Sequence, residues 1–351
     1  MLNFVEMNIS TTDTIKIRRI TAQLQKEHDR LRAKFKFLQF QDFIGLGLLI
    51  ISVFGILVSS YLWFVGVMST IVLVLTIAFW NSILHELEHD LIHGLYFKKV
   101  KFIHNIMLFT VWFFRPLTLN PWIRKYWHYN HHQHSGQPID IEERGVTNGE
   151  RWGFMRLLIT ADLVLGFVFR VRRLKREIKQ EKINGNFSDK DSKMLKNTVL
   201  FGLLPFGIPL HILFYCWIVL KSLLYLNLVS TNYWTNEFME IANVIIYIFV
   251  LPNLLRQFCL HFITSNMHYY GDIEEGNILQ QTQVLNSWWT WPFQLFCFNF
   301  GSTHSIHHFV VNEPFYLRQM SVKKAHEVFK QEGIRFNDTM SFKNANRYWS
   351  K

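Results

Sequence analysis

Histidine is the residue of this sequence whose spacing is best suited to chemistry. Three clusters on polar segments beside long apolar stretches read, in order, His85-x-x-x-His89, His128-x-x-His131-His132 and His304-x-x-His307-His308. On a helix, residues three and four positions apart share one face, so each cluster can direct two or three imidazoles to one point. Imidazole is the commonest metal ligand in proteins and suits iron, copper and zinc. Because eight imidazoles are too many for one ion, the clusters predict a two-metal site.

Other polar side chains could complete such a site. His268, in the segment 265–272, is a ninth candidate ligand. His93 and His134 follow clusters closely, and we expect them to support the site or the structure rather than bind metal. Nearby carboxylates could accept the remaining ring N–H groups and fix their orientation. These carboxylates are Glu86, Glu88, Asp90, Asp140, Glu142, Glu143, Asp272 and Glu274.

The composition excludes several classes of protein. Half of the 351 residues are hydrophobic and only 18% are charged, against about 25% in soluble domains. Cys216, Cys259 and Cys297 lie without CxxC spacing, which argues against a disulfide framework and against a thiolate metal site. The net charge of +11 comes from basic residues that flank apolar segments rather than from one nucleic-acid footprint. The composition therefore indicates a membrane protein.

Long apolar segments must position the clusters. Residues 43–84 are about twice the ~20 residues that one crossing needs, and Ser59-Ser60-Tyr61 is the expected turn within them. A second pair of apolar segments covers residues 198–226 and 240–263. The sequence therefore predicts an all-α integral membrane protein whose four transmembrane helices form two hairpins.

The basic residues predict which side of the membrane holds the clusters. Residues 16–36 carry eight Lys and Arg and residues 98–196 carry nineteen, whereas the connection 227–238 carries none. The positive-inside rule places the basic segments, and with them all three clusters, in the cytoplasm of a bacterial inner membrane or endoplasmic reticulum protein. The predicted organisation is a cytosolic N-terminal segment (1–41), a membrane catalytic domain with a histidine-rich helical cap (42–310) and a cytosolic C-terminal cap (311–351). An amphipathic helix is expected over residues 321–331.

Three further apolar stretches are expected at the membrane surface rather than across it. Residues 152–169 contain Arg156 and Asp162, and a charge inside lipid is costly, so an interfacial amphipathic helix is expected. Residues 103–119 are shorter and rich in aromatic side chains. Residues 287–292 contain three tryptophans, which is typical of an aromatic belt near the headgroups.

The first cluster also fits a different chemistry. His85-Glu86-Leu87-Glu88-His89 satisfies HExxH, the motif of zinc metallopeptidases in which the glutamate is the general base. That interpretation leaves the other two clusters unused, since catalytic zinc needs only three protein ligands. Histidines that only satisfy interfacial hydrogen bonds are a second alternative, and three clusters on one side argue against it.

The patterns HxxxH, HxxHH and HxxHH around paired apolar helices resemble those of the membrane fatty acid desaturase and hydroxylase superfamily. The resemblance covers residues 81–309 and implies a non-haem centre of two iron ions beneath a cytosolic cap. The implied ligands are His85, His89, His128, His131, His132, His268, His304, His307 and His308. A member that binds metal but has lost activity stays an alternative.

The resemblance also implies a reaction. Dioxygen would be the co-substrate, and oxidation of a fatty acyl chain linked to lipid, CoA or acyl carrier protein would give a double bond. Hydroxylation on the same scaffold is the alternative. Since the chain carries no haem or iron–sulfur motif, a ferredoxin or cytochrome b5-type donor with its reductase would act in trans. The basic cytosolic face could steer such a donor, which is commonly acidic.

Two details depart from the pattern of acyl-CoA desaturases. Those enzymes usually have one more residue in the first cluster and an asparagine four positions before the extra histidine. Here the first cluster is HxxxH, and Thr264 stands at the asparagine position, with Asn266 nearer to His268. The departure argues against a CoA-linked substrate.

Overall fold

The computed structural model describes residues 10–349, and within this range the chain is helical without a β-strand. Two isolated β-bridges, His268 with Thr282 and Val284 with Phe336, are its only extended pairings there. The three free cysteines form no disulfide among the described residues, as the sequence predicts.

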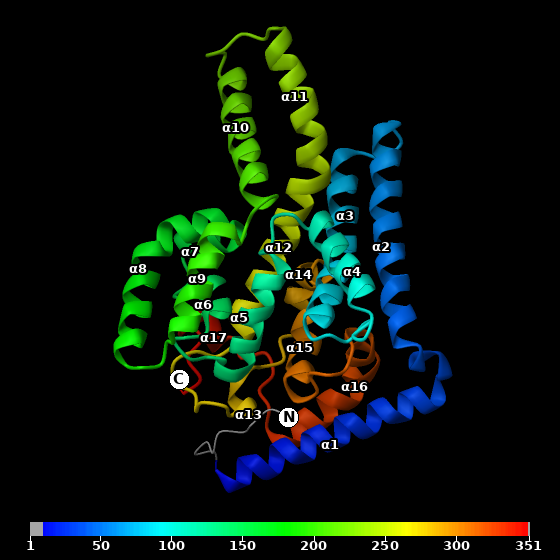
Figure 1. Cartoon of the computed structure of the whole chain (residues 1–351), viewed down its shortest axis with the longest axis vertical. Coiled ribbons are helices and arrows are strands. Elements are labelled where there is room, and N and C mark those ends of the chain that lie inside the picture. Colours follow the sequence, from blue (N-terminus) through cyan, green and yellow to red (C-terminus); the bar gives the residue numbers. More distant parts are fainter. Residues whose placement is uncertain (1–9, 350–351) are drawn as a thin grey trace.

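Four helical segments are long and apolar enough to cross a membrane. They are α2 (Gln41–Phe64), α3 (Thr70–Ile92), α10 (Gly207–Tyr225) and a continuous segment, Tyr233–Met267, made of α11 (Tyr233–Ile245), the π-helical turn η2 (Ile246–Val250) and α12 (Leu251–Met267). The predicted number of membrane-length helices is therefore confirmed. In Figure 1, α10 and α11 project together from the rest of the chain, and α2 and α3 lie side by side.

The turn between the first two apolar helices lies later than the sequence predicts. Ser59 and Ser60 are inside α2, where their hydroxyls donate to the carbonyls of Gly55 and Ile56, one turn earlier, at 2.7 and 2.9 Å. These bonds satisfy both serines within the helix, so a turn at 59–61 is wrong. The helix ends instead at Phe64, followed by Gly66 at a φ of +78°, a conformation that glycine adopts readily.

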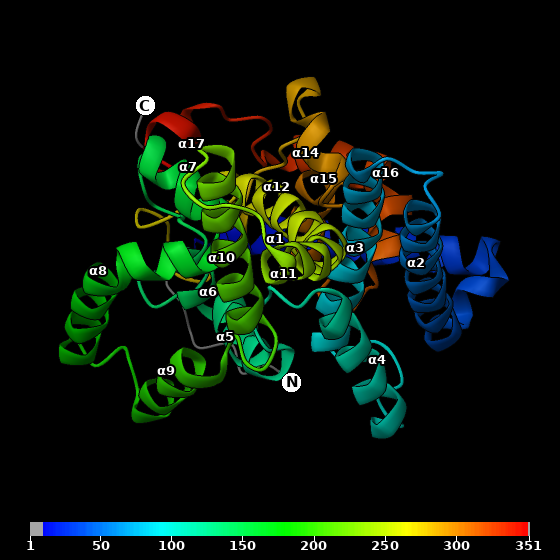
Figure 2. The same cartoon turned by 90° about the horizontal axis from the view of Figure 1, so that it is seen from above.

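The remaining helices surround these four segments. They are α1 (Thr11–Lys34), η1 (Lys36–Gln39), α4 (Lys101–Phe114), α5 (Pro121–His134), α6 (Ile141–Gly145), α7 (Phe154–Ala161), α8 (Leu163–Ile183), α9 (Asp189–Phe201), α13 (Ile278–Gln281), η3 (Trp288–Thr290), α14 (Trp291–Leu295), α15 (Phe300–Phe309), α16 (Phe315–Glu332) and α17 (Met340–Lys343). Figure 2 shows α3, α12 and α15 at the centre, with α8 and α9 at one side and α2 at the other.

The charged apolar stretch 152–169 does not form one helix. Asp162 ends α7 and caps α8, because its carboxylate accepts from the backbone N–H groups of Val164 and Leu165 at 2.8 and 3.1 Å. Arg156 is buried and donates to Ser265 O at 3.1 Å. Neither α7, α8 nor the aromatic α4 is among the candidate spans.

Helix α16, near the C-terminus, packs against helix α1, near the N-terminus. The predicted helix 321–331 is longer, as α16, and its buried Ala325, Val328 and Phe329 share a hydrophobic cluster with Ile20 and Leu24 of α1. Figure 1 shows α1 running beside α16 along the base of the molecule. Helices α1 and α16 therefore meet directly beneath α15, which carries the third histidine cluster.

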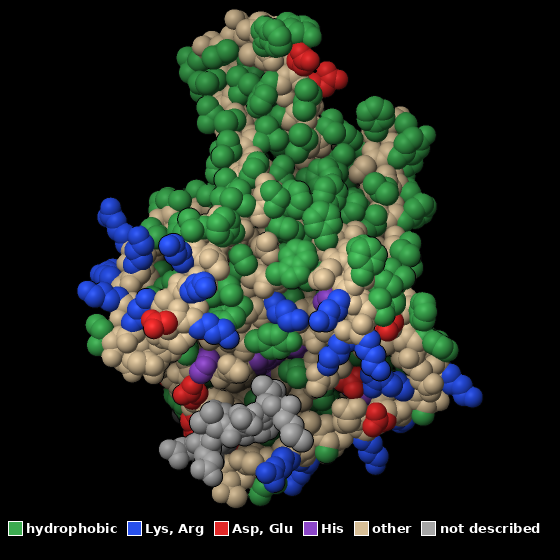
Figure 3. Space-filling view, viewed as in Figure 1, with side chains coloured by type: hydrophobic (Ala, Val, Ile, Leu, Met, Phe, Trp, Pro, Cys, Tyr) green, Lys and Arg blue, Asp and Glu red, His purple; other side chains and the backbone are tan. Residues whose placement is uncertain are grey.

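Apolar and basic side chains occupy different parts of the visible surface. Hydrophobic side chains cover the projecting ends of α10, α11, α2 and α3, and Lys and Arg gather around the opposite part (Figure 3). This separation is what a protein half inserted into lipid requires.

Candidate metal centre

Short polar helices and helix ends carry the histidines of the site. Asn120 caps α5 by accepting from Trp122 N at 3.0 Å, and Pro121 occupies the first helical position. The face that α5 then presents carries the second cluster, and α15 carries the third. His93 and His268 are the residues that end α3 and α12, at the same level as these two helices.

Five histidines form a first group whose ligand atoms all lie within 4.8 Å of one another. The members are His89, His93, His128, His132 and His307. Their Nε2 atoms face each other closely: those of His93 and His128 are 2.9 Å apart, and those of His132 and His307 are 3.0 Å apart.

Four further histidines form a second group under the same distance limit. The members are His131, His268, His304 and His308. The Nε2 atoms of His304 and His308 are 3.2 Å apart, and the rings of His131 and His268 have centroids 5.1 Å apart. The two groups adjoin, since the rings of His132 and His308 have centroids only 5.3 Å apart.

The structure thus brings together eight of the nine histidines that the sequence singles out. His85 lies outside both groups, with its Nδ1 at 3.3 Å from Nη2 of Arg115. His93, which we expected only to support the site, lies inside the first group. His134 lies outside both groups and contacts Glu275 at 2.9 Å.

The position of His93 has a signal in the sequence. His89-x-x-x-His93 repeats the spacing of His85-x-x-x-His89, so α3 carries two overlapping pairs of which His89 is the shared member. Sequence spacing alone does not choose between them. The choice depends on how far along α3 the helices α5 and α15 dock, which is a tertiary property.

Carboxylates and other acceptors orient several of the rings. The Nδ1 atoms of His128 and His131 lie 2.8 Å from Glu142 and Asp140, respectively. The Nδ1 of His308 lies 3.0 Å from Gln281 Oε1, an acceptor that nothing in the histidine spacing indicates.

The carbonyl of Thr264 contacts His268 Nδ1 at 2.9 Å, and the Thr264 hydroxyl donates to Glu143 at 3.1 Å. The other carboxylates singled out from the sequence have different partners. Glu86 and Asp90 face Arg318, Glu88 pairs with Arg115 and Arg124, Asp272 accepts from the backbone N–H of Tyr348, and Glu274 bonds Asn277.

The electrostatics favour neutral imidazoles in most of the centre. Burial lowers the pKa of His268 to about 3 and that of His93 to about 2. Burial also holds the pKa of His132, His304 and His307 well below its usual value. The form that these side chains adopt is therefore the neutral one that binds metal ions.

His131 is the exception among these rings. Burial by itself would lower its pKa, but the Asp140 carboxylate 2.8 Å away raises it to about 9. Burial raises the pKa of neighbouring Glu143 to about 8. A cation bound beside His131 would displace the proton from this ring.

The donor atoms of both groups suit metal ions. Where Nδ1 donates to an oxygen acceptor, as in His128 and His308, the neutral ring has an unprotonated Nε2 whose lone pair faces the group. The buried Nε2 atoms of His89 and His268 have no hydrogen-bond partner among the described residues. A cation within each group would give these buried nitrogens the partner that burial demands.

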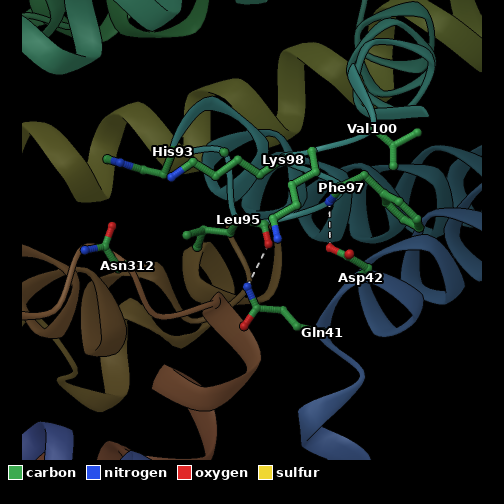
Figure 4. A pocket seen from close by; sticks show the side chains of 10 residues that line it. Gln41, Asp42, His93, Leu95, Phe97, Lys98, Val100 and Asn312 are labelled. Atoms are coloured by element: carbon green, nitrogen blue, oxygen red, sulfur yellow. Dashed lines mark hydrogen bonds between the residues drawn. The ribbon is translucent and has the colours of Figure 1, made fainter. Parts of the chain in front are cut away.

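A surface pocket of about 560 Å³ reaches the first group. His93, Lys98, Lys99 and Asn312 are among the residues that line it. Figure 4 shows His93 at one end of this pocket, and Gln41 and Asp42 bonded to the backbone of the segment 95–97 at 2.7 and 2.6 Å. The pocket gives the solvent side of the molecule a route toward the histidines.

Comparison with known proteins agrees with the fold and the site. Four membrane-length helices and two largely buried histidine groups fit a membrane protein with a histidine-rich site that could hold metal ions. Residues 62–339 match the fatty acid desaturase family, and the chain belongs to this family. The match includes all the histidines of both groups. No curated protein matches the chain.

Proposed function

We propose that this protein catalyses the dioxygen-dependent desaturation of a fatty acyl chain at a histidine-held centre of two iron ions. The observation that carries the proposal is the convergence of nine histidines, seven of them buried and His93 and His132 partly buried, into two adjoining groups in a chain of the fatty acid desaturase family. Redox metals and dioxygen supply chemistry that no protein side chain supplies alone. When bound, the iron ions would activate dioxygen for removal of hydrogen from an unactivated methylene.

The residues of this chain would hold and orient the metals. His89, His93, His128, His132 and His307 would bind one ion, and His131, His268, His304 and His308 the other. Asp140 and Glu142 fix the orientation of two of these rings and keep their Nε2 atoms directed inward. His85 in this assignment is not a ligand, because it lies outside both groups, where its Nδ1 contacts Arg115.

The proposed arrangement in the membrane is two hairpins, α2 with α3 and α10 with α11, below a cytosolic cap. The turns 65–69 and 226–232 carry no Lys or Arg, and the basic residues gather with the histidine groups at the other ends of these helices. By the positive-inside rule, the histidine groups would then face the cytoplasm. The HExxH peptidase interpretation has less support, since its pair His85 and His89 do not share a group.

The electron donor would be a separate protein. The pocket beside His93 is bordered by Lys98 and Lys99, and further basic residues lie on the same part of the surface. An acidic ferredoxin or cytochrome b5-type protein would be attracted to this face over a distance of about 10 Å at ordinary ionic strength.

Mass spectrometry of total fatty acids tests the reaction. A host that expresses the wild-type chain is compared with one that expresses His304→Ala, with equal protein in the membrane. We expect a fatty acid two mass units lighter than its precursor, absent in the variant, and fragmentation would locate the double bond.

Two results would contradict desaturation. A product sixteen mass units heavier, also dependent on His304, would make the protein a hydroxylase on the same scaffold. An unchanged fatty acid profile in a host that coexpresses ferredoxin and its reductase would remove the support for an acyl substrate.

A further inference from the structure

A buried arginine inside the fourth membrane-length segment has no partner. Arg256 of α12 is 1% exposed, and its Nε and Nη1 atoms make no hydrogen bond among the described residues. No carboxylate within the range 10–349 forms an ion pair with it. Arginine stays protonated in proteins, so this side chain is a cation held in the membrane part of the fold.

A second buried polar side chain without hydrogen-bond partners lies on α3, the helix that packs against α12. The electrostatic neighbours of Arg256 include Arg115 and His85. Asn81 lies one turn before His85 on α3, is fully buried, and leaves both its amide nitrogen and its oxygen without a hydrogen bond. Helices α3 and α12 pack directly against each other. Arg256, Asn81, His85 and Arg115 are called here the Arg256 cluster.

The acidic residues nearby are already used. Glu88 accepts from Arg115 at 2.5 Å and from Arg124 at 2.9 Å, while Glu142 accepts from Arg124 and orients His128. Three arginines therefore share two glutamates, and Arg256, although attracted by Glu88, is the one that forms no ion pair with either. Native proteins rarely keep an unpaired charge in the interior, because its desolvation is costly.

We propose that the Arg256 cluster binds an anionic oxygen group of the substrate, a carboxylate, inside the membrane domain. This inference rests on the proposed function and specifies its substrate class as an acyl chain with a free carboxylate rather than a CoA thioester. The guanidinium fork matches a carboxylate in two-point geometry, and the Asn81 amide adds a donor. An ionisable residue within a membrane segment marks a binding site by default.

The position of the cluster suits such a role. Asn81 and His89 are eight residues apart on α3, and Arg256 precedes His268 by twelve on α12, which correspond to about 12 and 18 Å along a helix. A carboxylate held at Arg256 would therefore leave an alkyl segment between itself and the histidine groups. The distance of the oxidised carbon from the carboxyl end would then be fixed by this anchor.

Binding and unfolding of the purified full chain in nanodiscs test the proposal without a turnover assay. The probes are palmitate and methyl palmitate, and the variants are Arg256→Gln, Arg256→Lys and Asn81→Leu. We expect palmitate binding to weaken about tenfold or more in Arg256→Gln and less in Arg256→Lys, which keeps the charge but loses the fork. Methyl palmitate should bind wild type and Arg256→Gln equally.

Thermal unfolding separates a binding role from a structural one. Because Arg256 is unpaired without ligand, ligand-free Arg256→Gln should unfold at a higher temperature than wild type, and palmitate should raise the Tm of wild type by more than that of Arg256→Gln. Lys221→Gln is the matched control, since it removes a cation from the membrane helix α10, away from the cluster. His304→Ala should keep palmitate binding, so a failure of the metal assignment leaves this test intact.

Three results would overturn the proposal. The first is a lower Tm of ligand-free Arg256→Gln, which would make Arg256 part of the structural charge network. The second is equal palmitate binding by wild type and Arg256→Gln. The third is a Tm increase by chloride alone that depends on Arg256 and matches that of palmitate, which would identify a small inorganic anion as the ligand.

Discussion

The Nε2 atoms of His93 and His128 lie 2.9 Å apart, one at the end of α3 and the other on α5. This contact joins a histidine outside the predicted ligand set to the centre of the second cluster. It also aligns α3 with α5 so that His89, one turn earlier, enters the same group. His85, a further turn earlier, is left to contact Arg115.

Replacement of His93 should therefore cost more metal than replacement of His85. Loss of a residue that orients a metal ligand lowers metal affinity about 10- to 100-fold. Because His93→Ala removes a ligand itself, we expect it to weaken iron retention by at least as much. His85→Ala should retain the iron content of wild type. The measurement is iron per chain in purified protein after dialysis against a chelator. Equal losses in the two variants would return His85 to the ligand set.

Glu142 links the metal centre to the buried arginines. Its carboxylate contacts His128 Nδ1 at 2.8 Å and Arg124 Nε at 3.0 Å, and the contact with His128 and the charge of Arg124 hold its pKa well below the usual range despite burial. Glu142→Gln keeps the shape and removes the charge, so iron affinity should fall about 10- to 100-fold. Competition with a chelator measures the affinity.

Glu275→Gln is the control for that experiment, because Glu275 also contacts a histidine, His134, but outside both groups. Its iron affinity should equal that of wild type. An unchanged affinity in Glu142→Gln would show that His128 is oriented without this carboxylate.

His28 should make the packing of α1 sensitive to acid. The buried ring contacts Ser321 Oγ of α16 at 2.9 Å, and burial lowers its pKa although Glu313 opposes the shift. A released α1 binds a proton below the ordinary pKa of about 6.5, whereas the packed helix does not. Packing should thus be complete above that pH and weaken as the pH falls toward the lowered pKa.

Hydrogen exchange of peptides from α1 at pH 7.5 and 5.5, corrected for intrinsic rates, measures this effect. His28→Gln should lose most of the difference in protection, and His134→Gln, at a partly exposed histidine elsewhere, should keep it. A difference that persists in His28→Gln would assign the acid sensitivity to another group.

Glu86 separates the proposed oxidation from peptide hydrolysis. In an HExxH peptidase this glutamate would be the general base. Here it is buried and its nearest cation is Arg318, at 3.5 Å. Glu86→Gln should therefore keep the iron content and retain product formation within about tenfold. Complete loss of product with full iron content would show that Glu86 has a direct chemical role.

Much of this fold follows from the apolar pattern of the sequence. The four membrane-length helices are confirmed because each depends on a local property, a run of about twenty apolar residues. The turn at 59–61 was wrong because a serine in a helix can bond its own backbone, and the glycine at 66 is the stronger signal. Both candidate turns, at the serines and at the glycine, are local features that can be compared from the sequence alone.

The sequence predicted the type of the metal centre and eight of its nine histidines, but it did not predict His93 as the ninth. Spacing identified the three clusters, since helical periodicity places such residues on one face, and His268 was singled out by its place in the segment 265–272 after the last apolar segment. The register along α3 that selects His93 over His85 depends on contacts with α5 and with His307 of α15. The partners Gln281 and Thr264, and the unpaired state of Arg256, likewise arise only when distant helices meet.

Metal analysis of the purified wild-type protein tests the central claim most directly. We expect two iron ions per chain. The iron content should be reduced both in His307→Ala, which changes the first group, and in His304→Ala, which changes the second. One zinc ion per chain, unaffected by His304→Ala, would contradict a two-iron centre and favour the metallopeptidase interpretation.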